Sequence, residues 1–193
     1  RILYTGNDDS NSINIAYTGN IGRSQKLENL VEICSNLQNQ NINFHIFGDG
    51  RFKKELEKKI IKSNINNIKI YKNLPVNELI LKIEKFDALL LMLAKEYSHT
   101  IPAKFQFYLS LGMPIIASID GYLNQLINEN NVGLASFSDD HKSFENNLIK
   151  FTKLTFDEKK TIADNAYKLY ENYFSKKIII NKIKKIIYEK NNY

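Results

Sequence analysis

Short apolar runs alternate along the chain with longer stretches in which apolar residues recur every three or four positions. The first run is INIAYTG at 13–19. The stretch that follows it carries apolar residues at helical spacing, namely Leu27, Leu30, Val31, Cys34 and Leu37. A short apolar run is typical of a buried strand, and a 3.6-residue period is typical of a helix with one buried face. The pattern therefore predicts a strand followed by a helix.

The same alternation recurs along the rest of the chain. Further strands are predicted by INFHIFG, NIKIY, DALLLML, PIIAS and VGLAS, and each is followed by a helical pattern. Strands that alternate with helices are typical of a parallel sheet with helices on both faces. Right-handed crossovers make such a sheet doubly wound. The predicted fold class is therefore α/β, with a doubly wound parallel sheet of about six strands and helices on both faces.

The length and the absence of linkers predict one domain. A chain of 193 residues is long enough for one well-buried core, and no Pro-rich or Gly-Ser linker or internal repeat interrupts the pattern. The first residues turn polar, with Asn, Asp and Ser, so 1–12 is predicted to be a linker or entering segment. Residues 13–193 are predicted to form the domain.

Composition and charge narrow the class of protein. The net charge is +6, but the lysines are spread along helices, and no basic cluster is interleaved with aromatic residues as in single-strand-binding proteins. We therefore expect anionic small molecules or an anionic membrane surface as partners, and no nucleic acid. The single cysteine, Cys34, suits a core thiol and a reducing cytoplasm. The longest apolar run, 88–94, is shorter than the roughly 18 residues that a membrane span needs.

The last predicted helix, SKKIIINKIKKIIYEK at 175–190, is basic and amphipathic. We expect its isoleucines to pack against the domain or against a neighbouring domain. The alternative is a helix that lies on a membrane surface, which the same pattern permits.

Glycine-bearing connections follow three of the predicted strands. They are GNIG at 19–22, GDG at 48–50 and DG at 120–121. The carboxyl ends of parallel strands meet at one edge of the sheet, where ligands bind. Glycine lets backbone amides approach a ligand closely, and the helix after each loop offers N–H groups to a phosphate. These loops predict a phosphorylated ligand, although they match neither the G-x-G-x-x-G motif nor the Walker motif.

The segment TIPAKFQFYLSLGMPIIASIDG at 100–121 contains a second anion-binding signal. Thr100 is predicted to cap a helix, and Pro102 to lie in its first turn, where a missing N–H is tolerated. Lys104 then lies near the positive end of the helix. Gly112 is predicted to end the helix, so that the next strand delivers Asp120 and Gly121 to the ligand edge.

The histidines and the cysteine predict no metal site. His99 lies in a loop on the ligand edge and can donate a hydrogen bond to a phosphate or a sugar hydroxyl, or it is an ordinary exposed histidine. His45 lies inside a strand and His141 at a helix start, so both are expected to be structural. Scattered histidines and one buried cysteine do not form a metal-ligand cluster.

In this order the motifs resemble the C-terminal, donor-binding domain of GT-B glycosyltransferases, in the retaining family 4 group that builds bacterial surface polysaccharides. The resemblance runs from about Ile13 to about Phe174. It rests on YTGNIGRSQKLENLVEI, FHIFGDGRFKKELE, NIKIYKNLPVNELILKIEKFDALLL and IPAKFQFYLSLGMPIIASIDG. The fold would then be the Rossmann-like half of a GT-B enzyme.

The resemblance implies a function and a set of site residues. The domain would bind a nucleotide diphosphate sugar, expected to be a UDP-sugar, for retaining transfer to a saccharide or lipid-linked acceptor. A missing N-terminal domain would hold that acceptor, and no cofactor or divalent metal is expected. The enzyme is expected in the cytoplasm. A narrower alternative is a location at the inner face of the membrane. The substrate-binding residues would be Gly19, Asn20, Gly22, Arg23, Gln25, Gly48, Gly50, Leu74, His99, Thr100, Lys104, Asp120 and Gly121.

Two departures from the family pattern concern the donor site. Many members carry two glutamates in an E-x7-E arrangement, the second of which reaches the ribose, whereas His99 and Phe107 occupy those places here. The arginine and lysine that relatives place in and after the first glycine loop appear as Asn20 and Gln25. Arg23 or Lys26 is a candidate replacement.

Three other functions remain open from the sequence. The missing glutamates allow a nucleotide-sugar-binding module without enzyme activity. A sugar-nucleotide epimerase of the same architecture would interconvert free nucleotide sugars without an acceptor. A nucleic-acid-binding protein would show strongly salt-dependent oligonucleotide binding.

Overall fold

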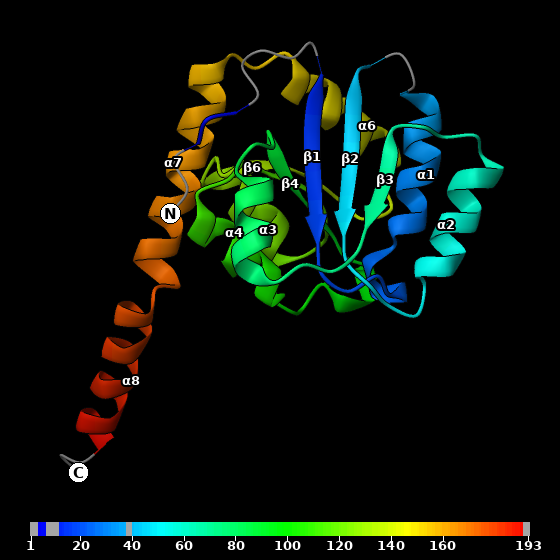
Figure 1. Cartoon of the computed structure of the whole chain (residues 1–193). Coiled ribbons are helices and arrows are strands. Elements are labelled where there is room, and N and C mark those ends of the chain that lie inside the picture. The colour runs from blue at the N-terminus through cyan, green and yellow to red at the C-terminus, as the bar shows by residue number, and fades with distance from the viewer. Residues whose placement is uncertain (1–3, 7–11, 38–39, 191–193) are drawn as a thin grey trace.

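Six parallel strands form a single sheet in the computed structural model of the protein, which describes residues 4–6, 12–37 and 40–190 (Figure 1). The strands are Ile13–Thr18 (β1), Ile42–Phe47 (β2), Ile68–Tyr71 (β3), Ala88–Met92 (β4), Ile115–Ser118 (β5) and Gly133–Ser136 (β6). Their order across the sheet is β3-β2-β1-β4-β5-β6.

The order of the strands reverses beside β1. Ile15 pairs with Phe44 of β2 on one side and with Ala88 of β4 on the other, and both pairings are parallel. The chain therefore winds outward from β1 to β3, crosses back to β4 and winds outward again to β6. The loops after β1 and β4 leave in opposite directions at this switch point, where open α/β sheets bind ligands.

Helices cover both faces of the sheet, each over its own apolar cluster. One face buries side chains of Leu27–Asn36 (α1), Lys53–Lys62 (α2) and His141–Thr152 (α6). The other buries side chains of Val76–Ile83 (α3), Ala103–Leu111 (α4), Tyr122–Glu129 (α5) and Phe156–Tyr173 (α7). Two 3₁₀ turns, Arg23–Gln25 (η1) and Lys95–Tyr97 (η2), follow β1 and β4, and Lys176–Lys190 (α8) ends the described chain. The predicted fold class is confirmed.

Local sequence explains where several helices begin and end. The Asp140 carboxylate accepts a 2.9 Å hydrogen bond from the Ser143 N–H at the start of α6. Thr155 and Glu158 form a reciprocal capping box at the start of α7. Gly112 ends α4 with φ 69, a left-handed conformation that glycine adopts without steric cost.

Two expectations about the ends of the chain need correction. Tyr4 is buried at 6% exposure and its hydroxyl donates to the Asp87 carbonyl, so this residue of the predicted 1–12 linker packs in the core. The residues 7–11 lie outside the described part of the chain. Five of the six isoleucines of α8 are 39–57% exposed and therefore do not pack closely against the domain, whereas packing against a neighbouring domain stays a prediction. Cys34 is buried as predicted.

No helix in the described ranges is long and apolar enough to cross a membrane.

Candidate functional site

The first two glycine loops are joined to each other by backbone hydrogen bonds at the carboxyl edge of the sheet. The Gly19 N–H donates to the Phe47 carbonyl at 2.8 Å, and the Ile21 N–H donates to the Asp49 carbonyl at 2.8 Å. A Cβ atom at Gly48 would lie 1.9 Å from the Gly19 carbonyl oxygen. Glycine is therefore required at position 48 by the close approach of the two loops. The structure brings these predicted residues together.

Side-chain amides close the first loop on itself. Gln25 Oε1 accepts from the Gly22 N–H at 3.0 Å and from the Asn20 side-chain amide at 3.4 Å. The Gln25 Nε2 group donates to the Ser24 hydroxyl at 2.8 Å. Asn20 and Gln25, at the places where the resemblance implies cations, thus shape the loop with neutral hydrogen bonds.

Lys104 places a buried amine beneath this loop. Its Nζ has less than 1 Å² of exposed surface and no hydrogen-bond partner among the described residues. The Nζ lies 3.6 Å from the centre of the Tyr17 ring, and a Cβ atom at Gly19 would lie 3.7 Å from it. Lys104 as a whole residue is half-buried, but its exposed surface belongs to atoms other than the amine. Burial lowers the pKa of Lys104 to about 7, because the charged form loses its hydration.

Two tyrosines hold the surroundings of Lys104 in place. The Tyr17 hydroxyl donates to the Asn20 carbonyl at 2.5 Å, which ties the ring under Lys104 to the glycine loop. The Tyr108 hydroxyl accepts from the Thr18 N–H at 3.0 Å, and burial raises the pKa of Tyr108 to about 12. Neither tyrosine was predicted from the sequence as part of the site. Tyr17 was recognisable as an aromatic residue at the end of a strand, just before a glycine loop.

Helix α4 presents its amino end at the same edge. It begins at Ala103 after Pro102, and no side chain caps it. The predicted capping role of Thr100 is wrong, because its hydroxyl donates to the Tyr97 carbonyl at 2.8 Å instead. The first N–H groups of a helix lack intrahelical partners and carry partial positive charge. The amino end of α4 therefore adds to the positive potential around Lys104.

The third glycine loop is held by contacts of its own. The Asp120 carboxylate accepts hydrogen bonds from both the N–H and the hydroxyl of Ser138. A Cβ atom at Gly121, which has φ 73, would lie 2.5 Å from the Ser98 carbonyl oxygen. Asp120 is thus engaged within the protein, and Gly121 lets the loop after β5 pack against the loop after β4.

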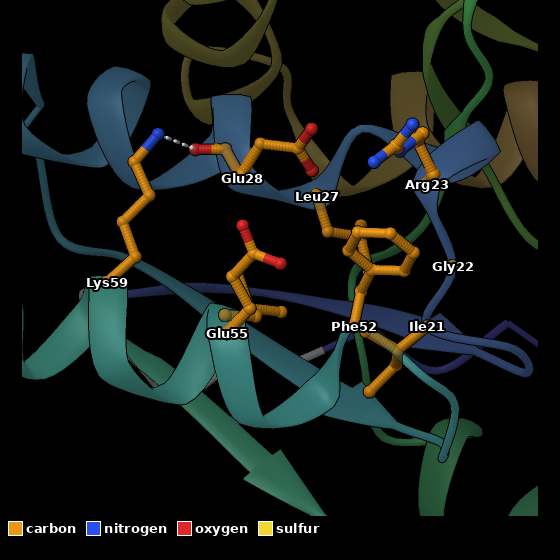
Figure 2. A pocket seen from close by; sticks show the side chains of 9 residues that line it. Ile21, Gly22, Arg23, Leu27, Glu28, Phe52, Glu55 and Lys59 are labelled. Atoms are coloured by element: carbon orange, nitrogen blue, oxygen red, sulfur yellow. Dashed lines mark hydrogen bonds between the residues drawn. The ribbon is translucent and has the colours of Figure 1, made fainter.

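A pocket of about 300 Å³ opens between α1 and α2, beside the first loop (Figure 2). The Arg23 guanidinium lies 5.4 Å from the centre of the Phe52 ring at one end of it. Figure 2 shows the carboxylates of Glu28 and Glu55 near its middle and Lys59 at the opposite end. Arg23 is thus directed over α2, so replacement of the loop cation by Arg23 stays a prediction.

The remaining predicted residues are more dispersed. Leu74 is half-buried between β3 and α3 and packs against the core. His99 is exposed between η2 and α4. Phe107, at the place where the resemblance implies a ribose-binding glutamate, is half-buried and packs against the core beside Tyr108. Among the described residues, no recorded contact joins Leu74, His99 or Phe107 to Lys104.

Across the ranges 4–6, 12–37 and 40–190, no three His, Cys, Asp or Glu side chains gather in a way that could hold a metal ion. His45 instead contacts the Tyr71 hydroxyl at 3.0 Å and the Asn14 side chain at 3.2 Å. The predicted independence from metals and cofactors stays a prediction.

The family model of glycosyl transferases group 1 matches residues 6–169, most of the chain. The chain belongs to this family. A comparison of the sequence with curated proteins finds no match.

Solved structures of glycosyltransferases share the fold of the domain. The C-terminal domain of a group 1 family protein, LpcC, from Francisella tularensis has a TM-score of 0.68 at 17% identity, with 85% of this chain and 87% of that chain covered. Anabaena HepE in complex with UDP and glucose has a TM-score of 0.75 at 16% identity, with 93% and 49% covered. Sucrose-phosphate synthase from Thermosynechococcus elongatus has a TM-score of 0.77 at 14% identity, with 92% and 45% covered.

These similarities define what the chain represents. It spans about half the length of HepE and of sucrose-phosphate synthase, but most of the separate LpcC C-terminal domain. The glycosyltransferase chain therefore has the fold of the C-terminal domain of a GT-B enzyme.

Proposed function

We propose that this domain binds the diphosphate of a nucleotide sugar, a UDP-sugar, as the donor half of a retaining family 4 glycosyltransferase. The acceptor is a saccharide or another lipid-linked acceptor in the synthesis of a surface polysaccharide. HepE and TarM, which have this fold, have been crystallised with UDP, which supports the choice of nucleotide. The buried free thiol of Cys34 suits a cytoplasmic site of action.

One observation carries the proposal, namely the buried amine of Lys104. A buried ammonium group without a hydrogen-bond partner or a counter-charge is costly, and natural proteins keep such groups mainly where a ligand supplies the counter-charge. The Nζ is at the switch point, between the first glycine loop and the ring of Tyr17. The anion that fits is a diphosphate, because the uncapped amino end of α4 offers further backbone N–H groups.

The proposed chemistry rests on stabilising a leaving group. During transfer, the bond between the anomeric carbon and the diphosphate oxygen breaks, and the electron pair stays on the diphosphate. The Lys104 ammonium and the N–H groups of α4 stabilise the charge that develops there. The acceptor oxygen forms the new bond to the anomeric carbon, and its proton passes to the departing diphosphate.

The acceptor side of the reaction is assigned to an N-terminal domain outside this chain. GT-B sites form in the cleft between two domains, so the chain by itself is proposed to bind the donor but to transfer no sugar. Ribose recognition is proposed to rest on groups other than position 107, because the ring of Phe107 offers no hydrogen bond to a hydroxyl group.

A thermal-shift series tests the donor site. A ligand that binds only the native state raises the melting temperature in proportion to the logarithm of its concentration above Kd. We expect UDP and UDP-sugars to raise the melting temperature of this chain, while uridine at the same concentration leaves it nearly unchanged. Equal shifts for uridine and UDP would contradict a diphosphate site. Interconversion of free UDP-sugars by the chain would favour an epimerase.

A further inference from the structure

The ring of Tyr17 lies directly against the Lys104 amine. Tyr17 is fully buried near the end of β1, and the centre of its ring lies 3.6 Å from the Lys104 Nζ. An aromatic ring attracts a cation over its negative face, most strongly where water is excluded. The Nζ has less than 1 Å² of exposed surface, so this contact lies in such a place. The ring therefore stabilises the charged amine more than an aliphatic side chain would.

The same side chain also holds the first glycine loop. The Tyr17 hydroxyl donates to the Asn20 carbonyl at 2.5 Å. Gly19 lies between these two residues, and a Cβ atom at Gly19 would lie 3.7 Å from the Lys104 Nζ. Tyr17 thus contacts both parts of the proposed phosphate site, the amine through its ring and the loop through its hydroxyl.

The groups that face Lys104 here are neutral. The titratable ones are Tyr17 on β1 and Tyr108 on α4, and burial raises the pKa of both phenols. The first loop contributes the uncharged side chains of Asn20 and Gln25. A carboxylate in place of the ring would neutralise the amine and compete with an anionic ligand, whereas a ring stabilises the ammonium group and leaves its charge available.

We propose that Tyr17 is a positioning residue of the donor site, whose ring holds the charged Lys104 amine beneath the first glycine loop until a diphosphate supplies the counter-charge. The ring stays in contact with the amine when the ligand is bound, and the hydroxyl keeps the loop in place above it. This inference rests on the proposed function, because it requires that Lys104 binds a diphosphate.

Calorimetric titration of the 193-residue chain with UDP tests the role of the ring. Fluorine withdraws electron density from the face of a ring and changes its shape little, so Tyr17→Phe is compared with a trifluorinated phenylalanine at position 17. At pH 8 the fluorinated ring should bind UDP about threefold to tenfold more weakly, because the amine is harder to charge beside it. At pH 6 the amine is largely charged in both proteins, so the difference should fall below about twofold. Uridine should bind both proteins equally.

The role of the hydroxyl is tested with a matched control. Tyr17→Phe removes the hydrogen bond to the Asn20 carbonyl and should weaken UDP binding about threefold, because the loop is then held less firmly. Tyr4→Phe also removes a hydroxyl of a buried tyrosine that donates to a backbone carbonyl, that of Asp87. It should leave UDP affinity nearly unchanged. Equal losses of UDP affinity for the two variants would overturn the role of the Tyr17 hydroxyl.

The outcomes also separate this inference from the proposed function. If Lys104→Met binds UDP as tightly as the unchanged chain, the diphosphate site is wrong and the role of Tyr17 is wrong with it. If Lys104→Met loses UDP affinity but the two rings bind UDP equally at pH 8, only the role of Tyr17 is overturned. Combined with Lys104→Met, the two rings should bind UDP equally, because the ring acts through the amine. A difference that persists there would make Tyr17 a structural residue. Equal melting temperatures of the two ring variants exclude unfolding as the cause of weaker binding.

Discussion

Lys104 and the lysines of α8 carry the same kind of charge in opposite surroundings. The Lys104 amine is buried, has no hydrogen-bond partner among the described residues and lies 3.6 Å from the centre of an aromatic ring. In α8, Lys176, Lys177, Lys182 and Lys184 lie at exposed positions of a helix beyond the main core. A buried charge interacts strongly with one ligand in a defined place, whereas exposed charges act weakly, together, and through a field that salt screens.

The comparison separates a rigid site from a tolerant one. The two glycine loops near Lys104 approach each other as closely as backbone atoms allow at Gly48, so an added atom at that point is expected to disturb both fold and binding. Helix α8 has few neighbours that a substitution could disturb. The following predictions would contradict or refine this contrast, beginning with the largest expected effect.

Gly48→Ala should give the largest loss. The new Cβ would meet the backbone oxygen of Gly19 at 1.9 Å, so the two loops would have to separate. We expect a loss of about 3 kcal/mol or more in the free energy of unfolding, because backbone cannot move aside as a side chain can. Urea unfolding followed by circular dichroism measures it.

Gly22→Ala is the matched control for this substitution. Its Cβ would meet only the ends of the Asn20 and Gln25 side chains, at 2.7 and 2.9 Å. Such ends can rotate away, so the loss should stay below about 1 kcal/mol. A loss for Gly22→Ala that equals the loss for Gly48→Ala would show that the close approach of the two loops is not what matters.

Lys104→Met should separate binding from stability. It removes a charge-assisted contact worth roughly 1.5 to 3 kcal/mol, so UDP affinity should fall about tenfold to a hundredfold while uridine binding is unchanged. The free domain should become more stable, by about 1 to 3 kcal/mol, because an unpaired buried amine is removed. Calorimetric titration and thermal unfolding measure the two effects. Equal losses for UDP and uridine would indicate that Lys104 is structural.

The affinity for UDP should depend on pH through the protonation of the Lys104 amine. With the pKa of Lys104 at about 7, the free domain loses this proton above pH 7, and a diphosphate that needs the charged form must restore it. UDP affinity should fall by up to about tenfold per pH unit between pH 7 and 9, and proton uptake should appear as a buffer-dependent heat of binding. Lys104→Met should show neither effect.

The stability of the free domain should change with pH in the opposite direction. Between about pH 7 and 10 the unfolded chain binds a proton at Lys104, where the ordinary pKa is 10.5, and the folded chain does not. The free energy of unfolding should therefore rise with pH, by up to about 1.4 kcal/mol per unit, relative to Lys104→Met. A parallel pH dependence in the two proteins would contradict the lowered pKa.

The smallest effect is expected at α8. Ile187 is 53% exposed, so Ile187→Ala should change the free energy of unfolding by less than about 0.5 kcal/mol. Ile60→Ala on α2 is the reference, because Ile60 is 8% exposed and its truncation should cost about 2 to 4 kcal/mol. Similar losses for both would show that α8 packs against the domain in solution.

Periodicity was sufficient to predict the architecture. The apolar runs at 42–48 and 87–93 contain strands of the sheet, and the helical spacing after 19 places Leu27 and Cys34 in the core. Such patterns report burial, and burial is what determines which face of an element points inward. The exposed isoleucines of α8 follow the same pattern, so periodicity alone did not reveal that the domain leaves them uncovered.

The candidate site was predictable only in outline. The glycine loops and Lys104 were placed at one edge because parallel strands bring their carboxyl ends together. Partner identity depends on side-chain direction, which spacing does not encode. Thr100 therefore hydrogen-bonds to the Tyr97 carbonyl instead of capping α4, and Asp120 is engaged by Ser138. The Tyr17 ring under Lys104 comes from a strand 87 positions earlier in the chain.

The pairing of the two glycine loops has a consequence for how this protein can diverge. The bonds that hold the loops together run between main-chain atoms of Gly19, Ile21, Phe47 and Asp49, and all residue types supply the same carbonyl. Substitutions at neighbouring positions such as Asn20 and Arg23 can therefore accumulate in descendants without dismantling the frame. Changes in those side chains can therefore alter the donor preference. Position 48 must remain glycine, because a Cβ atom there would clash with the Gly19 carbonyl oxygen.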